Sequence, residues 1–264
     1  MTILVFIVVL VVLIVVHEFG HFVVAKLSGM RVDEFGLGYP PRAAILGRVG
    51  ETLLTLNWIP FGGFVKIHGE DAIEEEGKDP RAFSSKPRHI QAIVLVAGIA
   101  MNLLLALIIF TGLLMTPHRI SDHEIASPLP LISALVKGAE VTWHVTAATA
   151  VGLAHFFAGV LTFSADLSQV TGPVGIAGAV GAAAQSGWQS LLSLTALISV
   201  NLALINLIPI PALDGGRLLF VIIEAIIRRP IKPIVAQTVN AAGFAFLILL
   251  MVVVTLHDVY KIIG

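Results

Sequence analysis

Two histidines and a glutamate near the N-terminus have the types and the spacing of a hydrolytic metal site. His17 and His21 lie four positions apart in the order H-E-x-x-H, with Glu18 directly after the first histidine. Residues four apart share one face of an α-helix, so both imidazoles can reach one metal ion. The adjacent carboxylate is then placed to act as general base toward a water that the metal activates. The alternative is a polar helix end at a membrane interface with two incidental histidines.

The third metal ligand should be a carboxylate or another histidine, because the chain contains no cysteine. Asp214 is the best candidate, since it is the one acidic residue in N-L-I-P-I-P-A-L-D-G-G at 206–216. The prolines and glycines of this stretch must interrupt or end a helix, and irregular backbone at membrane depth is tolerated where it lines a cavity. Asp214 could instead cap a helix or a turn. The other histidines show no ligand spacing: His68, His89, His118, His123, His144, His155 and His257.

The elements that must position these residues are membrane-spanning helices. The chain is 57% hydrophobic and 12% charged, with a mean hydropathy of +0.96. These values predict an all-α polytopic membrane protein, with the whole chain, 1–264, as a single membrane-embedded domain. The net charge of −1 argues against a nucleic-acid partner. Four spans are expected, at about 2–27, 89–115, 191–213 and 233–257, and the first is expected to be retained because no basic segment precedes it.

Between the spans we expect a small membrane-associated β-hairpin and one further helix. The hairpin is predicted at about 51–68, with strands at 51–58 and 64–68 and a turn at 59–63. It either closes a loop or offers an edge strand to an unwound substrate, with Phe61, Gly62 and Gly63 as contacts.

A second helix-forming stretch, at about 131–163, is apolar but carries charges and histidines. It is expected to be an amphipathic interfacial helix or to re-enter the membrane. Asn102 lies in the second span, where it either makes an interhelical hydrogen bond or contacts the substrate.

The distribution of basic residues predicts the orientation. Nine of the 16 Lys and Arg lie between Lys26 and Arg88, and four more lie between Arg217 and Lys232. By the positive-inside rule both connections are cytoplasmic, so spans one and three run in the same direction. His17 and Asp214 then both lie toward the cytoplasmic ends of those spans, provided that 131–163 does not cross once.

Beyond this reasoning, the chain resembles a known family. H-E-F-G-H at 17–21 and N-L-I-P-I-P-A-L-D-G at 206–215 look like the site-2 proteases, and most of all like the bacterial RseP group. Further matches are F-G-L-G at 35–38, I-P-F-G-G-F-V-K at 59–66, F-S-S-K at 83–86 and G-P-V-G-I-A at 172–177.

The resemblance implies an intramembrane zinc metalloprotease that cuts single-span membrane proteins such as anti-sigma factors or signal-peptide remnants. It implies His17, His21 and Asp214 as Zn²⁺ ligands, Glu18 as the catalytic base and Asn206 as a contact for the substrate or the transition state. The hairpin at 51–68 would be the membrane-associated β-structure of the family.

Two features depart from the family pattern. RseP-type proteins usually carry PDZ domains between the second and third spans, but the stretch from Met115 to Leu191 is short and shows no such strand pattern. The chain is either a naturally minimal member or has lost a segment near 117–128. Ile99 also stands where the family commonly has proline. Two other functions use the same residues: a membrane metal transporter or metal-binding structural protein, and a non-proteolytic partner subunit, against which the intact motifs argue.

Overall fold

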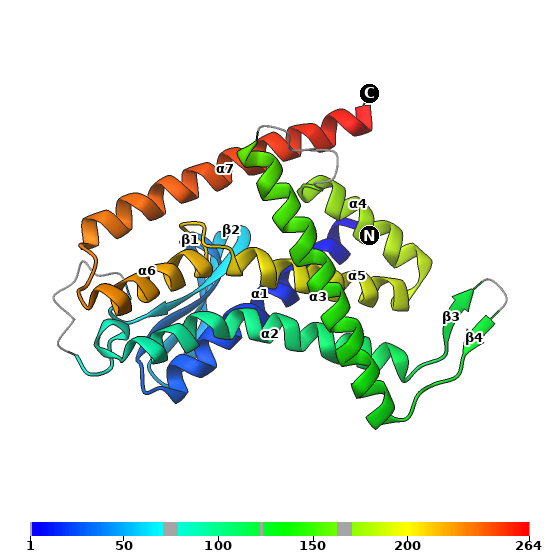
Figure 1. Cartoon of the computed structure of the whole chain (residues 1–264), viewed down its shortest axis with the longest axis horizontal. Helices are drawn as coiled ribbons and strands as arrows, with labels where there is room; N and C mark the ends of the chain where they lie inside the picture. Colours follow the sequence, from blue (N-terminus) through cyan, green and yellow to red (C-terminus); the bar gives the residue numbers. More distant parts are fainter. Residues whose placement is uncertain (1, 71–78, 122–123, 163–170, 264) are drawn as a thin grey trace. The chain divides into compact units, whose positions relative to one another are not determined.

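The computed structural model describes residues 2–70, 79–121, 124–162 and 171–263 (Figure 1). Within them, β1 pairs with β2 and β3 pairs with β4. The elements in chain order are α1 (Thr2–Leu27), β1 (Val32–Val49), β2 (Thr52–Ile67), a short 3₁₀ turn (Phe83–Ser85), α2 (Arg88–Leu114), β3 (His118–Ser121), β4 (Glu124–Ala126), α3 (Leu131–Leu161), α4 (Pro173–Ser186), α5 (Trp188–Leu207), α6 (Asp214–Ile227) and α7 (Pro233–Ile263).

Among the described residues, four helices are long and apolar enough to cross a membrane: α1, α2, α5 and α7. The prediction of four spans in a mostly helical chain is therefore matched by the structure. The third span ends earlier than predicted, at Leu207 instead of residue 213, because Pro209 and Pro211 cannot continue its hydrogen-bond ladder. The fourth runs on past residue 257 to Ile263.

The chain folds into two compact units. One contains residues 11–101 and 206–244, and the other contains residues 1–10, 102–205 and 245–264. All the predicted metal and catalytic residues belong to the first unit, together with the hairpin, α6 and the first turns of α7.

The hairpin is larger than the sequence predicted, and its turn lies elsewhere. The segment 59–63 is not a turn, because β2 continues through it, and the chain instead reverses at Gly50, whose φ of +60° suits glycine. The glycines and prolines of β1 hid this strand from sequence analysis. In the observed register, Val32–Leu37 pairs antiparallel with Gly63–Ile67, Arg42–Val49 pairs with Thr52–Asn57, and Glu34–Leu37 also lies beside Leu53–Leu56 with the residue numbers rising together.

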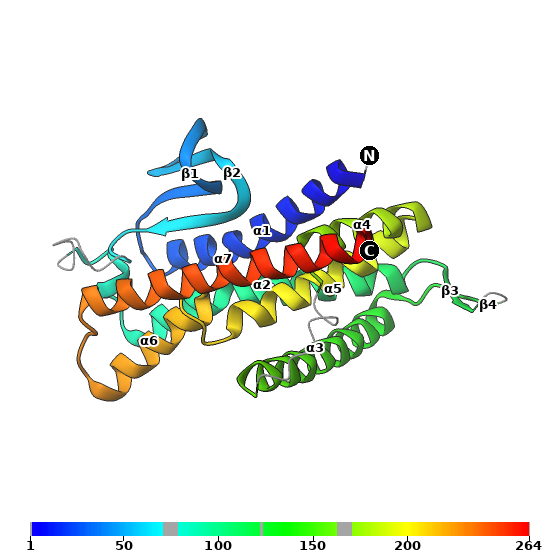
Figure 2. The same ribbon diagram turned by 90° about the horizontal axis from the view of Figure 1, so that it is seen from above.

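The sheet is held against the second half of α1, beside which it lies in Figure 2. A cluster of buried apolar residues joins the sheet to α1, α2 and α6; its members include Ala25, Val32, Ile67, Val94 and Val221. Gly20 lets α1 approach the backbone of α2, since a Cβ at this position would meet the carbonyl oxygen of Ala97. The face of α1 that carries His17 and His21 is thereby fixed against α2.

In the other unit, α3 packs against α2 and α5. Gly138 of α3 lies directly on Thr111 of α2, and Val145 packs on a buried cluster made by Ala106 of α2 with Ala196 and Val200 of α5. The helix crosses α2 and α5 at a steep angle and does not run alongside them (Figure 1). The predicted helix at 131–163 thus exists as α3.

The start of α4 explains part of the G-P-V-G-I-A motif. The backbone N–H of Gly175 donates a hydrogen bond to the Asp258 carboxylate of α7 at 2.8 Å, and a Cβ on Gly172 would meet the same carboxylate. The carboxylate therefore occupies the N-terminal end of α4, where free N–H groups favour a negative charge. Glycine is needed at 172 because the carboxylate takes the space.

Candidate metal centre

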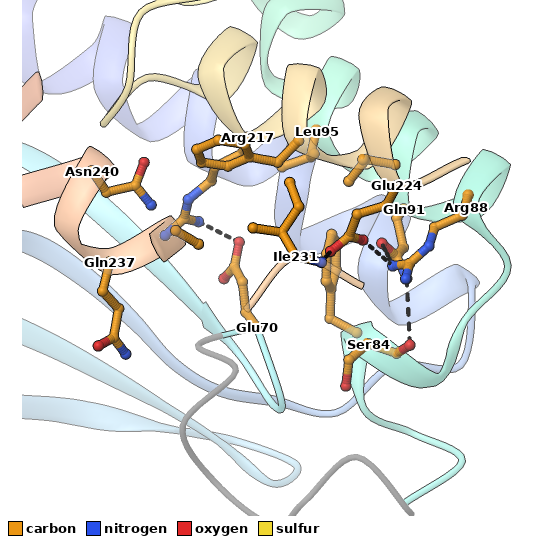
Figure 3. Close-up of a pocket in the computed structure, with 14 residues that line it drawn as sticks. Glu70, Ser84, Arg88, Gln91, Leu95, Arg217, Glu224, Ile231, Gln237 and Asn240 are labelled. Carbon is orange, nitrogen blue, oxygen red and sulfur yellow. Dashed lines mark hydrogen bonds and ion pairs between the residues drawn. The ribbon is translucent and has the colours of Figure 1, made fainter. Parts of the chain in front are cut away.

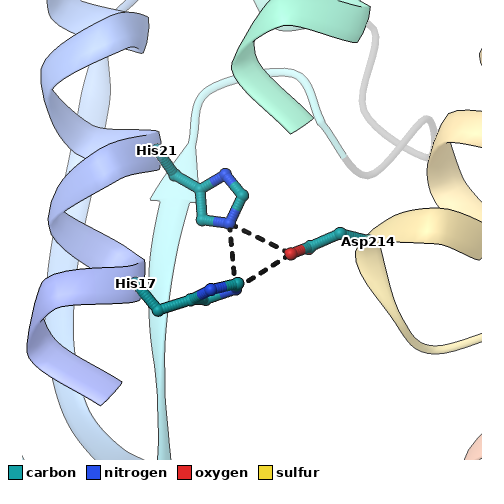
Figure 4. A group of neighbouring side chains, drawn as sticks. All are labelled: His17, His21 and Asp214. Carbon is teal, nitrogen blue, oxygen red and sulfur yellow. Dashed lines mark hydrogen bonds and ion pairs between the residues drawn. The ribbon is translucent and has the colours of Figure 1, made fainter. Parts of the chain in front are cut away.

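The side chains of His17, His21 and Asp214 meet at one point (Figure 4). The Nε2 atom of His17 lies 2.9 Å from Oδ2 of Asp214, and the Nε2 atom of His21 lies 3.2 Å from the same oxygen. The two imidazole nitrogens are 3.3 Å apart. Atoms that share a tetrahedral metal ion at about 2.0–2.2 Å are separated by similar distances. The structure therefore brings together the three ligands predicted from the sequence.

The donor set fits zinc. Two imidazole nitrogens and one carboxylate oxygen are the ligands of many catalytic zinc sites, which keep a fourth position for water. The Nδ1–H of His21 donates a 2.8 Å hydrogen bond to the carbonyl oxygen of Val94, which fixes the tautomer and leaves Nε2 for the metal. Both histidines are 7% exposed. The three residues could hold Zn²⁺ in a largely buried setting.

Asp214 reaches the histidines because the chain turns sharply between α5 and α6. The N–H of Ile210 donates to the carbonyl of Ile208 at 2.7 Å, and the N–H of Leu213 donates to Ile210 at 3.2 Å. Gly215 then packs on the carbonyl oxygens that end α5, where a Cβ would have no room. Asp214 is thus the first residue of α6, aimed across this turn at α1.

The floor of the site is formed by the backbone of α2. A Cβ on Gly98 would meet Nε2 of His21 and the ring of His17, so the imidazoles fill the space that a side chain would take. Sequence analysis assigned Gly98 no role, because its contact is made between helices far apart in the sequence.

Glu18 faces the hairpin. Its Cγ would lie 3.1 Å from a Cβ placed on Gly63, so the second strand of the sheet passes directly beside the predicted base. Gly62, with φ of +88°, lies against the ring of Tyr39. Burial raises the pKa of the Tyr39 hydroxyl, and the negative charge of Glu18 raises it further. Phe61 belongs to β2. The predicted substrate contacts at 61–63 therefore come from the part of β2 that lies beside the base.

The two predicted asparagines fall in different places. The amide nitrogen of Asn206, at the end of α5, lies 3.4 Å from Nε2 of His17. Asn102 belongs to the other unit, where it is fully buried and its backbone carbonyl accepts a 2.8 Å hydrogen bond from the hydroxyl of Ser199.

A cavity of about 140 Å³, lined by both apolar and charged residues, lies between α2, α6 and the start of α7 (Figure 3). Arg217 pairs with Glu70 on one side of it, and Arg88 pairs with Glu224 at 2.8 Å on the other. Sequence analysis assigned no role to these residues. One feature of the sequence could have drawn attention to them: an arginine lies only three residues after Asp214, in a helix that follows a membrane span.

Comparison with known proteins places the chain in a defined group. The model of peptidase family M50 matches residues 5–250. A relative from Clostridium perfringens that carries a zinc metalloprotease name is 34% identical, over 94% of this chain and 95% of its own length. A similarly named relative from Clostridium acetobutylicum is 30% identical, over 94% of each chain. The zinc metalloprotease RasP of Oceanobacillus iheyensis is 25% identical over 99% of each chain.

The alignment with RasP spans 425 positions, although this chain has 264 residues. RasP therefore contains one or more long segments with no counterpart here.

Proposed function

This chain belongs to peptidase family M50, and from that premise we propose that it cleaves peptide bonds within or near the transmembrane segments of other membrane proteins. The family and the relatives make it a zinc metalloprotease of the site-2 type. With four apolar helices of spanning length, it is a multi-pass bacterial membrane protein. The place of cleavage and the nature of the substrate are our proposals.

The proposal rests on one observation: the side chains of His17, His21 and Asp214 meet at one point, and the two histidines belong to α1, a helix of spanning length. His17 and His21 lie well inside α1 (Thr2–Leu27), and their atoms meet the carboxylate of Asp214 within 3.3 Å. Ionisable groups on a spanning helix are costly and are functional by default. A hydrolytic site in this position can act on a peptide that lies in the membrane.

Each residue of the site has its own role in the proposed reaction. His17, His21 and Asp214 hold the zinc ion, whose Lewis acidity activates a water for attack on a carbonyl when it is bound. The Glu18 carboxylate takes a proton from the attacking water and delivers it to the leaving amide nitrogen. Asn206, beside His17, is placed to donate its amide N–H to the carbonyl oxygen under attack.

The sheet is proposed to hold the substrate in an extended form. A transmembrane helix hides its carbonyls in hydrogen bonds, so the cleaved segment must unwind. Gly63–Ile67 is an outer segment of the sheet and begins beside Glu18. A peptide added to this edge as a further strand would present its carbonyls to the site, with Phe61, Gly62 and Gly63 in contact. Asn102 remains a predicted contact.

The extent of the protease domain, its membrane and its orientation are inferred from the sequence. We propose that the whole chain, 1–264, works as one protease domain of a bacterial inner membrane, with its site toward the cytoplasm and single-span proteins as substrates. The steep crossing of α3 over α2 and α5 supports an interfacial or re-entrant position for this helix. The basic residues before α2 and between α5 and α7 support the orientation.

Glu18→Gln tests the proposal, because the amide keeps the size of the carboxylate but cannot take a proton. With a single-span model substrate in proteoliposomes, we expect cleavage to fall by at least about 100-fold while bound zinc stays at the wild-type level. His144→Gln, at an exposed position on α3, is the matched control and should cut normally. Persistent cleavage by Glu18→Gln would reject the assigned base, and zinc flux without proteolysis would favour a transporter.

A further inference from the structure

The loop that carries Asp214 has one residue in an uncommon backbone conformation. Ala212 has φ of +76°, in the left-handed region that residues with a Cβ disfavour. It stands two positions before Asp214, so its conformation sets the direction in which α6 starts. Such a conformation persists only where neighbouring groups hold it.

The neighbour that contacts this residue is α7. The backbone N–H of Ala212 donates a hydrogen bond to Oδ1 of Asn240 at 3.3 Å. One turn further along the same face of α7, Gly243 packs directly on Pro211, where a Cβ would meet both the carbonyl oxygen and the side chain of the proline. Asn240 and Gly243 together form a clasp on residues 211–212.

The clasp is close to the metal site in the sequence, because Ala212 is only two residues before Asp214. Pro211 and Ala212 lead through Leu213 into Asp214, whose Oδ2 faces His17 and His21. The first turn of α6 closes on the same loop, since the N–H of Gly216 donates to the carbonyl of Leu213 at 3.0 Å. If Ala212 relaxed from its left-handed conformation, the carboxylate would turn away from the imidazoles.

We propose that Asn240 is a positioning residue for the metal ion: α7 holds Ala212 in its left-handed conformation and so keeps Asp214 aimed at the two histidines. This rests on the proposed role of Asp214 as a zinc ligand. Asn240 is not one of the three proposed ligands, and it lines the cavity between α2, α6 and α7, near Arg217 (Figure 3). Partners that orient metal ligands commonly change metal affinity about 10- to 100-fold when removed.

Zinc affinity of the purified full-length protein, measured by competition with a chelating dye, is the direct test. Asn240→Ala should weaken zinc binding about tenfold, because Ala212 loses its acceptor. Asn240→Asp retains an acceptor oxygen and should bind zinc nearly as the wild type does. Thr238→Ala is the matched control on α7, since its exposed hydroxyl bonds only to Ile234 of its own helix. It should leave zinc affinity unchanged.

Two further measurements separate positioning from general destabilisation. At saturating zinc, Asn240→Ala should regain wild-type kcat with unchanged KM, which a damaged substrate site would not do. Glycine adopts positive φ without cost, so Asn240→Ala should weaken zinc binding less in an Ala212→Gly background. If Asn240→Ala does not fold, Gly243→Ala, which would displace Pro211, provides the same comparison.

The outcomes distinguish this inference from the proposed function. If Asp214→Ala lowers zinc affinity but neither Asn240→Ala nor Gly243→Ala does, the clasp is rejected and the ligand set stands. If Asp214→Ala itself binds zinc as the wild type does, the proposed ligand set fails, and the positioning role fails with it.

Discussion

At the scale of single residues, the metal site combines parts that can be read from the sequence with parts that cannot. The spacing of His17 and His21 fixes their common face on any helix, and the absence of cysteine narrows the third ligand to residues such as Asp214. Gly98 lies against the two imidazoles and Asn240 bonds to the loop before Asp214, and both contacts join segments that are far apart in the chain. Glycine and asparagine also occur in membrane helices where they serve helix packing or hydrogen bonds between helices, so their residue types alone do not indicate a role at the metal site.

Gly98→Ala should damage the site without touching a ligand. The added Cβ would overlap Nε2 of His21 and the ring of His17, so the two imidazoles must separate. We expect zinc affinity to fall by about 10- to 100-fold, as for other changes that misalign metal ligands. Gly112→Ala, on the same helix but with no atom within 4 Å of its added Cβ, is the control and should bind zinc normally. Wild-type affinity in Gly98→Ala would mean that the site adapts to the extra methyl group.

At the scale of elements, the four spanning helices and α3 were predicted from the sequence, whereas of the sheet only β2 was, and α4 and α6 were not. Uninterrupted apolar runs predicted α1, α2 and α7 closely, and the prolines after α5 marked the change of direction before α6. The strand β1 was missed because it contains Gly36 and Gly38, which read as a break. In the structure both are required by close contact: a Cβ on Gly36 would meet the ring of Phe64, and one on Gly38 would meet the carbonyl oxygen of Ile59. Such contacts between strands leave no local pattern.

Glu34, in strand β1 of the sheet, should contribute to stability in a way that depends on pH. Burial alone would raise the pKa of Glu34, but hydrogen bonds from Thr55 and Arg42 outweigh it and hold the pKa below its usual 4.5. A carboxylate with a lowered folded pKa stabilises the fold above the unfolded pKa, and that contribution is lost as pH falls through the folded value.

Glu34→Gln should therefore lower the free energy of unfolding by about 1 kcal/mol at pH 7, after allowance for solvent screening. The difference from wild type should shrink as the pH falls below about 4. Thermal unfolding of both proteins in the same detergent across this range measures it. A difference that stays constant down to pH 3 would show that the charge of Glu34 contributes nothing.

At the scale of the whole molecule, the zinc site ties together parts of the chain that are distant in sequence. His17 and Asp214 are separated by 197 positions, and the same unit contains the hairpin and the start of α7. A ligand that binds only the folded state stabilises it by RT ln(1 + L/Kd), where L is the free ligand concentration, so the gain rises as the ligand concentration exceeds the dissociation constant. The family assignment could be predicted from the motifs alone, whereas the division into two units could not, because it depends on packing along each helix.

Removal of zinc should lower the thermal stability of the protein as well as abolish activity. With zinc at about 100 times its dissociation constant, chelation should lower the unfolding temperature by roughly 5 to 10 °C. Restoring zinc should reverse the shift, and Asp214→Ala should show a much smaller one. An unfolding temperature that is insensitive to chelation in the wild-type protein would contradict a structural contribution of the metal.

The separation of the ligands along the chain also has a consequence for synthesis. The ribosome makes the H-E-x-x-H segment first and Asp214 only after three further helices of spanning or near-spanning length. On the proposed ligand set, a nascent chain that has inserted α1, α2 and α5 still lacks one of its three zinc ligands. The protease would thus stay inactive until Asp214 and the start of α6 have been made and have reached the histidines.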